Sequence, residues 1–445
     1  MRRLVVVLAL AACDDGGGET NPPVTDMAVP DRGIIQADMA PADQGAGGEP
    51  ADGAVLDMAV PVADMGPPQP DLCDETVGYG LQAPLAALEG APRSVPRAVW
   101  TGSEWGVMWQ APSAENPGVN EVWFRRFDAS GTPVGEPALL GLAKLPQQEI
   151  TWNGGGFVAV WLSSRTAGGG IDGIKVQLLG VDGTPTGPSV DVPSTFDVAH
   201  LDAAWSPGAG GMIVYTRGMA GAGGLFAVPL DESGTPSAPM RLSETETRGP
   251  TVAYGDGSWG AAWLDRASGV PSDLVFVVLN DRGQPISQPR RQVDAGAQGA
   301  AYVAYGQGTY GVGWSKVNEM GQLGAFLTLF DSAGDLLATP PVPGAEGFGL
   351  VTDVAWLDPN TFGVAWQDNG PQAVTVGLSR VNTSGVVSNP LRLVLEAGHA
   401  GTGLRAAGNL TRAGIFYVDD PMPAPGGGFS AQARILTGVL GPCDD

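Results

Sequence analysis

A short sequence motif with two aromatic residues occurs seven times along the chain, and this repeat constrains the fold more than any other feature. Its first copy runs from Trp100 to Trp109, and the copies are spaced by 48 to 54 residues. A repeat of this length, too small to bury its own apolar face, is typical of a β-propeller. The second aromatic residue of each copy is Trp109, Trp161, Tyr215, Trp263, Trp314, Trp366 or Tyr417. The spacing therefore predicts an all-β protein with seven blades, with six or eight blades as the alternatives.

Each copy contains four strand signals. The second is almost continuously apolar, as in residues 157–161, which predicts an inner strand covered on both faces. The third alternates between apolar and polar residues, most clearly over residues 174–178. The fourth is short and weakly apolar, as expected of an outer edge strand. A turn glycine between the third and fourth runs keeps the same period, at Gly131, Gly183, Gly234, Gly283, Gly334, Gly385 and Gly438.

The last copy is incomplete. Residues 404–438 supply only three strands, whereas residues 79–88 have the Gly-to-Pro spacing and apolar tail of a repeat's second half. We expect residues 79–88 to add the fourth strand of the last blade and to close the ring. Closure of a ring removes most of its exposed sheet edge. Residues 73–445 are accordingly assigned to the propeller.

The N-terminus has the features of an export signal. Arg2 and Arg3 precede the short apolar run 4–10, which is too short to span a bilayer. The residues that follow, Leu10-Ala11-Ala12-Cys13, resemble the lipobox of bacterial lipoproteins. That resemblance implies a signal peptide over residues 1–12 and acyl chains on Cys13, which anchor a protein stably when two or more are present. An ordinary signal peptide with an incidental cysteine is the alternative.

Residues 13–72 predict a disordered acidic linker. They are rich in Asp, Ala, Pro and Gly, and residues 14–76 hold 14 acidic residues against the single basic residue Arg32. Such a segment cannot bury enough apolar surface to offset its ordering entropy, and self-repulsion extends it. The net charge of −24 for the whole chain argues against nucleic acid and against adhesion to anionic lipid. We expect membrane contact through the lipid anchor only.

The chain has three cysteines. With Cys13 assigned to lipid, Cys73 and Cys443 remain, one just before the closing strand and one near the chain end. Ring closure would bring these two ends together in an oxidising compartment. We therefore predict a Cys73–Cys443 disulfide, with two unpaired thiols as the alternative.

Catalytic motifs are scarce. His200 and His399 have no ligand-like neighbours, and no nucleophile elbow or phosphate-binding loop is found, so no cofactor is expected. One candidate site consists of the charged residues two positions beyond the second aromatic residue. In a propeller they would share one rim, where clustered carboxylates can hold a hard cation such as calcium or divide acid and base roles. Polar strand ends in solvent are the alternative. The candidate rim comprises Arg217, Asp265, Lys316, Asp368 and Asp419.

Over residues 74–445 the chain resembles the uncharacterised β-propeller lipoproteins of myxobacteria and related Gram-negative bacteria. This resemblance rests on the lipobox, on the linker rich in Asp-Met pairs and proline, and on the repeated aromatic motif. It implies the fold and a cell-envelope location. The leading hypothesis is a tethered, non-enzymatic binding or scaffolding module that presents one propeller face to a protein or glycan. The alternatives are a polysaccharide hydrolase or lyase that uses the rim carboxylates, and a passive surface or spacer protein. Inner and outer membrane are both left open.

Overall fold

The computed structural model describes residues 96–439, apart from 165–170, 194, 196, 219–222, 267–271, 318–321, 343–348, 359, 370–373, 387–390, 395–398, 410–411 and 422–431. From residue 387 onward the description covers the backbone only. The chain divides into two units, Met1–Gly66 and Pro67–Asp445, and every described residue belongs to the second. The predictions for Cys13, the 13–72 linker, the 79–88 strand and the Cys73–Cys443 disulfide lie outside the described residues.

All regular elements in the described part of the chain are β-strands, arranged in five antiparallel sheets. The first sheet contains β1 (Arg97–Trp100), β2 (Glu104–Pro112), β3 (Asn120–Asp128), β4 (Pro133–Trp152), β5 (Gly156–Ser164), β6 (Ile171–Gly180) and β7 (Val190–Asp191). The second contains β8 (Val198–Ser206), β9 (Gly210–Arg217), β10 (Gly224–Leu230) and β11 (Met240–Ser243).

The third sheet contains β12 (Glu246–Gly255), β13 (Ser258–Arg266), β14 (Ser272–Leu279), β15 (Arg290–Gly306), β16 (Thr309–Val317), β17 (Leu323–Asp331) and β18 (Leu336–Ala338). The fourth contains β19 (Gly349–Asp358), β20 (Thr361–Asn369), β21 (Val374–Asn382) and β22 (Leu391–Val394). The fifth contains β23 (His399–Asn409), β24 (Arg412–Pro421) and β25 (Gln432–Val439). The first and third sheets each combine two units, because β4 and β15 pair with the preceding strand over their first half and with the following strand over their second half.

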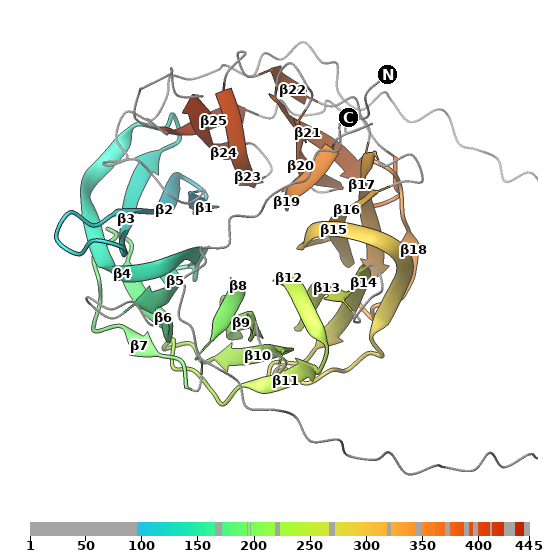
Figure 1. Ribbon diagram of the computed structural model, residues 1–445, viewed down its shortest axis with the longest axis horizontal. Helices are drawn as coiled ribbons and strands as arrows, with labels where there is room; N and C mark the ends of the chain where they lie inside the picture. The colour runs from blue at the N-terminus through green and yellow to red at the C-terminus, as the bar shows by residue number, and fades with distance from the viewer. Residues whose placement is uncertain are drawn as a thin grey trace, which may run out of the picture. The chain divides into compact units, whose positions relative to one another are not determined.

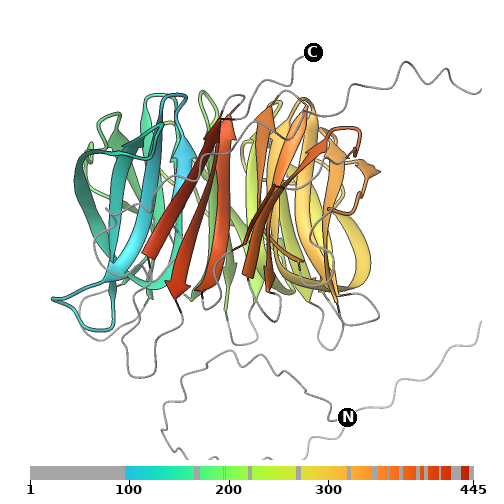
Figure 2. The same ribbon diagram turned by 90° about the horizontal axis from the view of Figure 1, so that it is seen from above.

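The sheets are arranged in a propeller-like way. In Figure 1 the first strand of each unit lies nearest the centre, and Figure 2 shows the strands running side by side along the central axis. Consecutive first strands contact one another in the order β1, β4, β8, β12, β15, β19 and β23, and β23 also contacts β1. Residues far apart in sequence are thereby brought together at the centre.

The second strands form the core, as predicted. Every residue of β5 is buried, and the fully buried side chains include most aromatic residues of the repeat, such as Trp161 and Trp314. Neighbouring units pack closely because an aromatic ring of one unit lies against a glycine of the unit before. A Cβ atom added to Gly260 would lie 2.5 Å from the Tyr310 ring, and one added to Gly311 would lie 2.9 Å from the Phe362 ring. The aromatic–glycine pair in the repeat is thus a packing requirement.

The turn glycines adopt the left-handed backbone conformation that the turn chemistry requires. Gly234 has a φ of 76°, and the Asp231 carboxylate accepts hydrogen bonds from the Ser233 and Thr235 amides at 2.9 Å each. In another unit the Asn280 side-chain oxygen accepts the corresponding hydrogen bonds, from the Arg282 amide at 2.9 Å and the Gln284 amide at 3.0 Å. Either residue type can therefore build the turn.

Replacing Asp231 by asparagine should keep the turn and reduce acid sensitivity. The hydrogen bond from the Ser233 hydroxyl lowers the pKa of Asp231. Because this folded-state pKa lies below the unfolded value, the stabilisation is present above the unfolded pKa and is lost as the pH falls through the folded one. We expect an unchanged Tm at neutral pH and a smaller fall in Tm on acidification to about pH 2.5. The reverse change, Asn280→Asp, should enlarge that fall, and equal acid sensitivity in both variants would contradict the assignment.

Two details of the sequence prediction are wrong. Gly438 was expected in a turn, but it lies within β25 and pairs with Ala413, so the last copy is longer than its glycine spacing implied. The expected alternation of the third strand is also incomplete. Gln177 is buried, with its amide donating to the Gly187 carbonyl, and six consecutive residues of β14 are buried. These strands are covered on both faces. The short outer strands β7, β11, β18 and β22 agree with the prediction.

A candidate ligand-binding site on the axis

Each first strand places one residue at the same register position. This residue pairs with the residue directly before the second aromatic residue of the repeat, as Arg97 pairs with Met108 and Glu149 with Val160. We call the residues at this position the axial ring. Arg405 is included by backbone register alone. The axial ring comprises Arg97, Glu149, Asp202, Thr251, Tyr302, Asp353 and Arg405.

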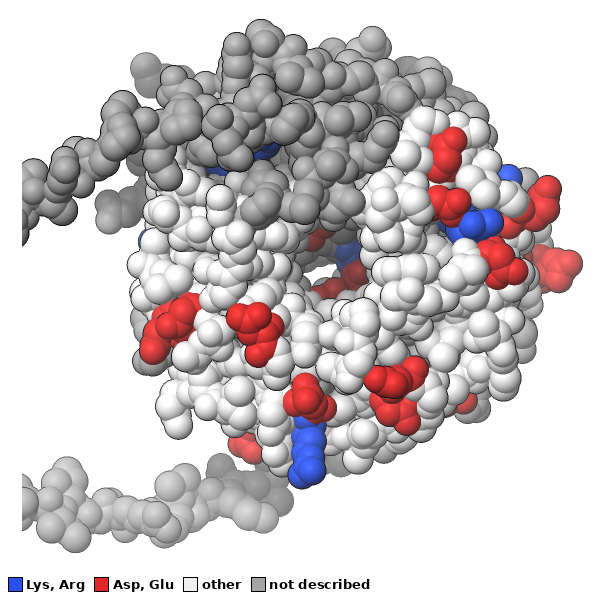
Figure 3. Space-filling model, turned by 180° about the vertical axis from the view of Figure 1, so that it is seen from behind, with Lys and Arg blue, Asp and Glu red and all other residues white. Residues whose placement is uncertain are grey.

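The axial ring surrounds a cavity. The cavity has a volume of about 310 Å³, and its lining includes the six axial-ring residues from Arg97 to Asp353 together with His200 and Gln147. Figure 3 shows the corresponding hollow near the centre of one face, with acidic and basic side chains inside it. Charged groups from separate units therefore converge on one enclosed space.

Part of the axial ring joins neighbouring first strands. β8 and β12 each have one sheet neighbour, which leaves backbone groups on their inner edges to be satisfied by other means. The Asp202 carboxylate accepts a hydrogen bond from the Val252 amide at 2.8 Å, and the Thr251 hydroxyl accepts one from the Val303 amide at 3.3 Å. Arg97 Nε similarly donates to the Gln148 carbonyl at 3.0 Å. These bonds fix the orientation of the ring side chains.

The charges of the ring are close and poorly hydrated. One Arg97 guanidinium nitrogen lies 2.7 Å from a Glu149 carboxylate oxygen, and the two side chains are only 14% and 12% exposed. Burial raises the pKa of Glu149 well above its usual value; Arg97 opposes this rise, and Asp202 and Asp353 add to it. Burial likewise raises the pKa of Asp202, and it lowers the pKa of His200 with help from Arg248. The cavity thus favours protonated carboxyl groups and a neutral imidazole.

Replacing Asp202 by asparagine should flatten the dependence of stability on pH. The folded-state pKa of Asp202 is raised, so its contribution is fully present below the unfolded pKa and is lost as the pH rises through the folded one. An asparagine oxygen can still accept the bond from the Val252 amide. We expect Tm to fall less between about pH 4 and pH 8 in the variant than in the wild type. An equal fall in both proteins would show that Asp202 ionises in the folded state without cost.

The predicted rim residues lie on the second strands of five different units. Arg217 is in β9, Asp265 in β13, Lys316 in β16, Asp368 in β20 and Asp419 in β24. None of these five residues is among those lining the axial cavity. The rim therefore remains a prediction that is separate from the cavity.

Two rim side chains have contacts that define their environment. Asp265 is 2% exposed and accepts a hydrogen bond from the Thr245 hydroxyl. The Arg217 guanidinium lies 5.9 Å from the centre of the Phe226 ring. Within the described ranges, no group of three or more His, Cys, Asp or Glu side chains is arranged to hold a metal ion.

The axial ring was not among the residues predicted from the sequence. Its signal is a residue three positions before the first aromatic residue of the first six copies, as at Arg97 before Trp100, Glu149 before Trp152 and Asp202 before Trp205. His200, which the sequence offered no role, lies in β8 and lines the cavity.

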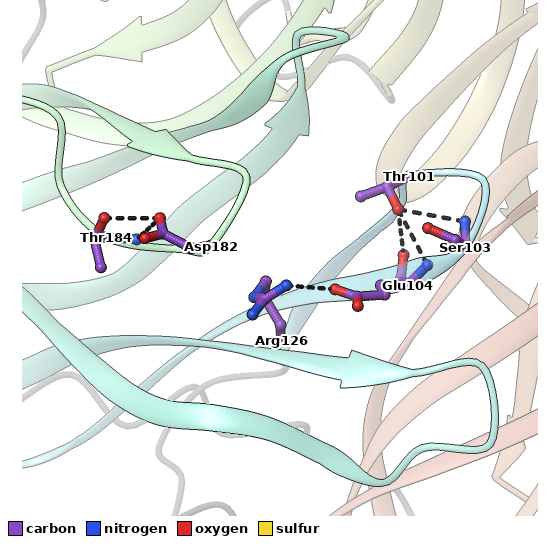
Figure 4. A network of polar contacts seen from close by, with 6 residues as sticks. All are labelled: Thr101, Ser103, Glu104, Arg126, Asp182 and Thr184. Carbon is purple, nitrogen blue, oxygen red and sulfur yellow. Dashed lines mark hydrogen bonds and ion pairs between the residues drawn. The ribbon is translucent and has the colours of Figure 1, made fainter.

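A second polar network lies near the turns of the first two units. Arg126 of β3 contacts the Glu104 carboxylate at 2.8 Å, and the Thr101 hydroxyl accepts hydrogen bonds from the Ser103 and Glu104 amides (Figure 4). None of these residues lines the axial cavity. The network holds the turn after β1 and is best explained as structural.

No protein-family model and no curated protein matches the chain. Among solved structures, the polysaccharide lyase Uly1 is 9% identical, with a TM-score of 0.51 over 82% of this chain and 93% of that one. A subtype N10 neuraminidase-like protein of A/little yellow-shouldered bat is 10% identical, with a TM-score of 0.41 over 64% of this chain and 93% of that one. An exo-beta-1,3-galactanase from Phanerochaete chrysosporium is 10% identical, with a TM-score of 0.37 over 82% of this chain and 99% of that one.

At such identities the likeness to the lyase concerns the fold alone. Together with the sheet arrangement, it defines an all-β, propeller-like protein with a polar cavity on its axis. In the described part of the chain, no helix is long and apolar enough to cross a membrane.

Proposed function

We propose that this chain is a lipid-anchored module of the cell envelope that binds a protein or glycan partner at the axis of its ring. The observation that carries the proposal is the cavity of about 310 Å³, on which charged side chains from separate units converge. Buried charges are costly unless they are paired or used in binding.

The ring of this proposal has seven blades and is closed by the N-terminal segment. The seven first strands support the count, and the contact between β23 and β1 supports closure. The last sheet has three described strands where the outer strand of another unit would be a fourth. Residues 79–88 would supply that strand.

A disulfide between Cys73 and Cys443 would fasten the closed ring, with Cys13 carrying the lipid. The loop-entropy model gives several kcal/mol for so long a loop, although measured values are often smaller. We expect thiol titration of the denatured, lipidated protein to detect no free thiol before reduction and two afterwards. Two titratable thiols before reduction would contradict the disulfide.

Partner capture in the native envelope tests the binding function. The lipidated protein would be crosslinked, affinity-purified and identified by mass spectrometry, with Asp353→Asn as the cavity variant. Asp191→Asn is the matched control, because the Asp191 side chain is 72% exposed on the outer strand β7. We expect a stoichiometric partner with the wild type and the control, and reduced recovery with Asp353→Asn. Equal recovery with all three, or no saturable partner, would overturn the proposal.

A polysaccharide hydrolase or lyase is the second candidate. Glu149, whose pKa is raised by burial, and Asp353 line the same cavity, and this favours an enzyme because acid and base roles need two carboxyl groups. The sequence places this chemistry on the rim carboxylates Asp265, Asp368 and Asp419. Conversion of these three to asparagine should abolish turnover of a polysaccharide without unfolding the protein if the rim is catalytic. Absence of turnover in the wild type would leave the binding module as the account.

A further inference from the structure

We infer that the axial cavity binds one sugar unit, whose hydroxyl groups meet the carboxyl and guanidinium groups of the axial ring. The inference rests on the proposed binding function and names the ligand class of that same site. The sugar would be either a free monosaccharide or the end of a glycan chain, because both present the same hydroxyl groups.

The size of the cavity suits a single sugar ring. Its volume of about 310 Å³ is at the lower end of the range for small-molecule sites. The side chains that line the cavity between the polar groups are small, and they include Ala98, Ala203 and Ala300. A longer ligand would therefore enter with one end only.

The charges of the lining select a neutral ligand. A compact anion would meet the carboxyl groups of Glu149, Asp202 and Asp353, whereas a compact cation would meet the Arg97 guanidinium. Sugar hydroxyl groups both donate and accept, so they can donate to carboxyl oxygens and accept from the guanidinium at once. A neutral polyhydroxylated molecule is the ligand class that can form hydrogen bonds with both the guanidinium and the carboxyl groups of the lining.

The uncharged members of the lining add to this match. Tyr302 offers an aromatic body with a polar tip, and it is the aromatic residue of the lining. The lowered pKa of His200 keeps its imidazole neutral, with one donor and one acceptor nitrogen. Protonated Glu149 would likewise gain a donor hydrogen. Hydroxyl groups can pair with each of these atoms.

The test is calorimetric titration of the full lipidated chain in detergent. The probes are glucose, galactose and N-acetylglucosamine, their β-1,4-linked trimers, and two charged compounds, methylammonium and glucuronate. We expect saturable binding of at least one neutral sugar that is at least about tenfold weaker in Asp202→Asn and Asp353→Asn, the change expected when a hydrogen bond to the ligand is lost. The control Asp191→Asn should bind as the wild type does, and Asp265→Asn tests the rim separately from the cavity. A trimer that binds more tightly than its monomer would assign the site to a chain end.

Three results would overturn the inference. These are binding of methylammonium or glucuronate in preference to every neutral sugar, loss of sugar binding in Asp265→Asn but not in the cavity variants, and no binding of any neutral probe. If one cavity variant fails to fold, the other provides the comparison. A protein partner captured through the cavity without sugar binding would leave the proposed function standing and would remove this inference alone.

Discussion

Replacing Trp366 by alanine should lower the free energy of unfolding by about 3–5 kcal/mol, the usual cost of removing a fully buried tryptophan. Trp366 lies in the core between β19 and β21, and its ring packs directly against Gly377. Its indole nitrogen donates to the Ser379 hydroxyl at 2.9 Å. The substitution therefore removes apolar contact and one buried hydrogen bond together. Urea denaturation followed by circular dichroism measures the loss.

A conservative variant separates the two contributions. Trp366→Phe keeps most of the apolar contact and loses the bond to Ser379, so we expect a cost of about 1–3 kcal/mol. Trp123→Ala is the comparison for tryptophan position, because Trp123 is only partly buried in the outer part of its unit. If Trp123→Ala lowered the free energy of unfolding as much as Trp366→Ala does, the second aromatic residue of the repeat would not form the core.

Replacing Gly260 by alanine should cost about 1–3 kcal/mol, the range for adding a methyl group to a packed interior. The new Cβ would lie 2.5 Å from the Tyr310 ring and 3.0 Å from the Phe276 ring. Tyr310 has little freedom to move, because its hydroxyl bonds with Ser258 and the Gly255 carbonyl across the boundary between units. The strain should therefore appear at the contact between β13 and β16.

Gly155 provides the matched control. A Cβ atom there would meet only the Asn153 side-chain oxygen, at 3.8 Å, and Gly155 does not adopt a positive φ. We expect Gly155→Ala to leave the urea midpoint nearly unchanged. Hydrogen exchange should also accelerate along β13 and β16 in Gly260→Ala and not in Gly155→Ala. Equal effects of the two substitutions would contradict the interlocking of units through aromatic–glycine pairs.

The repeat predicted the strand order well because its signals are local. The aromatic residues, the turn glycines and the continuous apolar runs each follow from contacts within one unit or with the next. Alternation in the third strand was less informative, because units on both sides cover that strand. Gln177 shows the reason, since a polar residue can be buried when its amide finds backbone partners.

The axial cavity could not be predicted in the same way. Its residues are 49 to 53 positions apart from Arg97 through Asp353, and they differ in chemical type. Their common feature is a position three residues before the first aromatic residue of the repeat, and only the folded ring shows that this position faces the axial cavity. Rim residues such as Asp265 were predicted as a site because they directly follow the apolar run of the second strand. Asp265 itself is buried against Thr245, which illustrates that a polar residue at a strand end need not face solvent.

Site-specific photocrosslinking tests the central claim, that the axis is the binding site, most directly. A photoreactive amino acid would replace Gln147, which lines the cavity, or Leu139, which lies on the same strand β4 and is 52% exposed. After illumination in the native envelope, we predict an adduct of defined mass from position 147 and none from position 139. An adduct from position 139 alone, or equal adducts from both positions, would contradict binding at the axis.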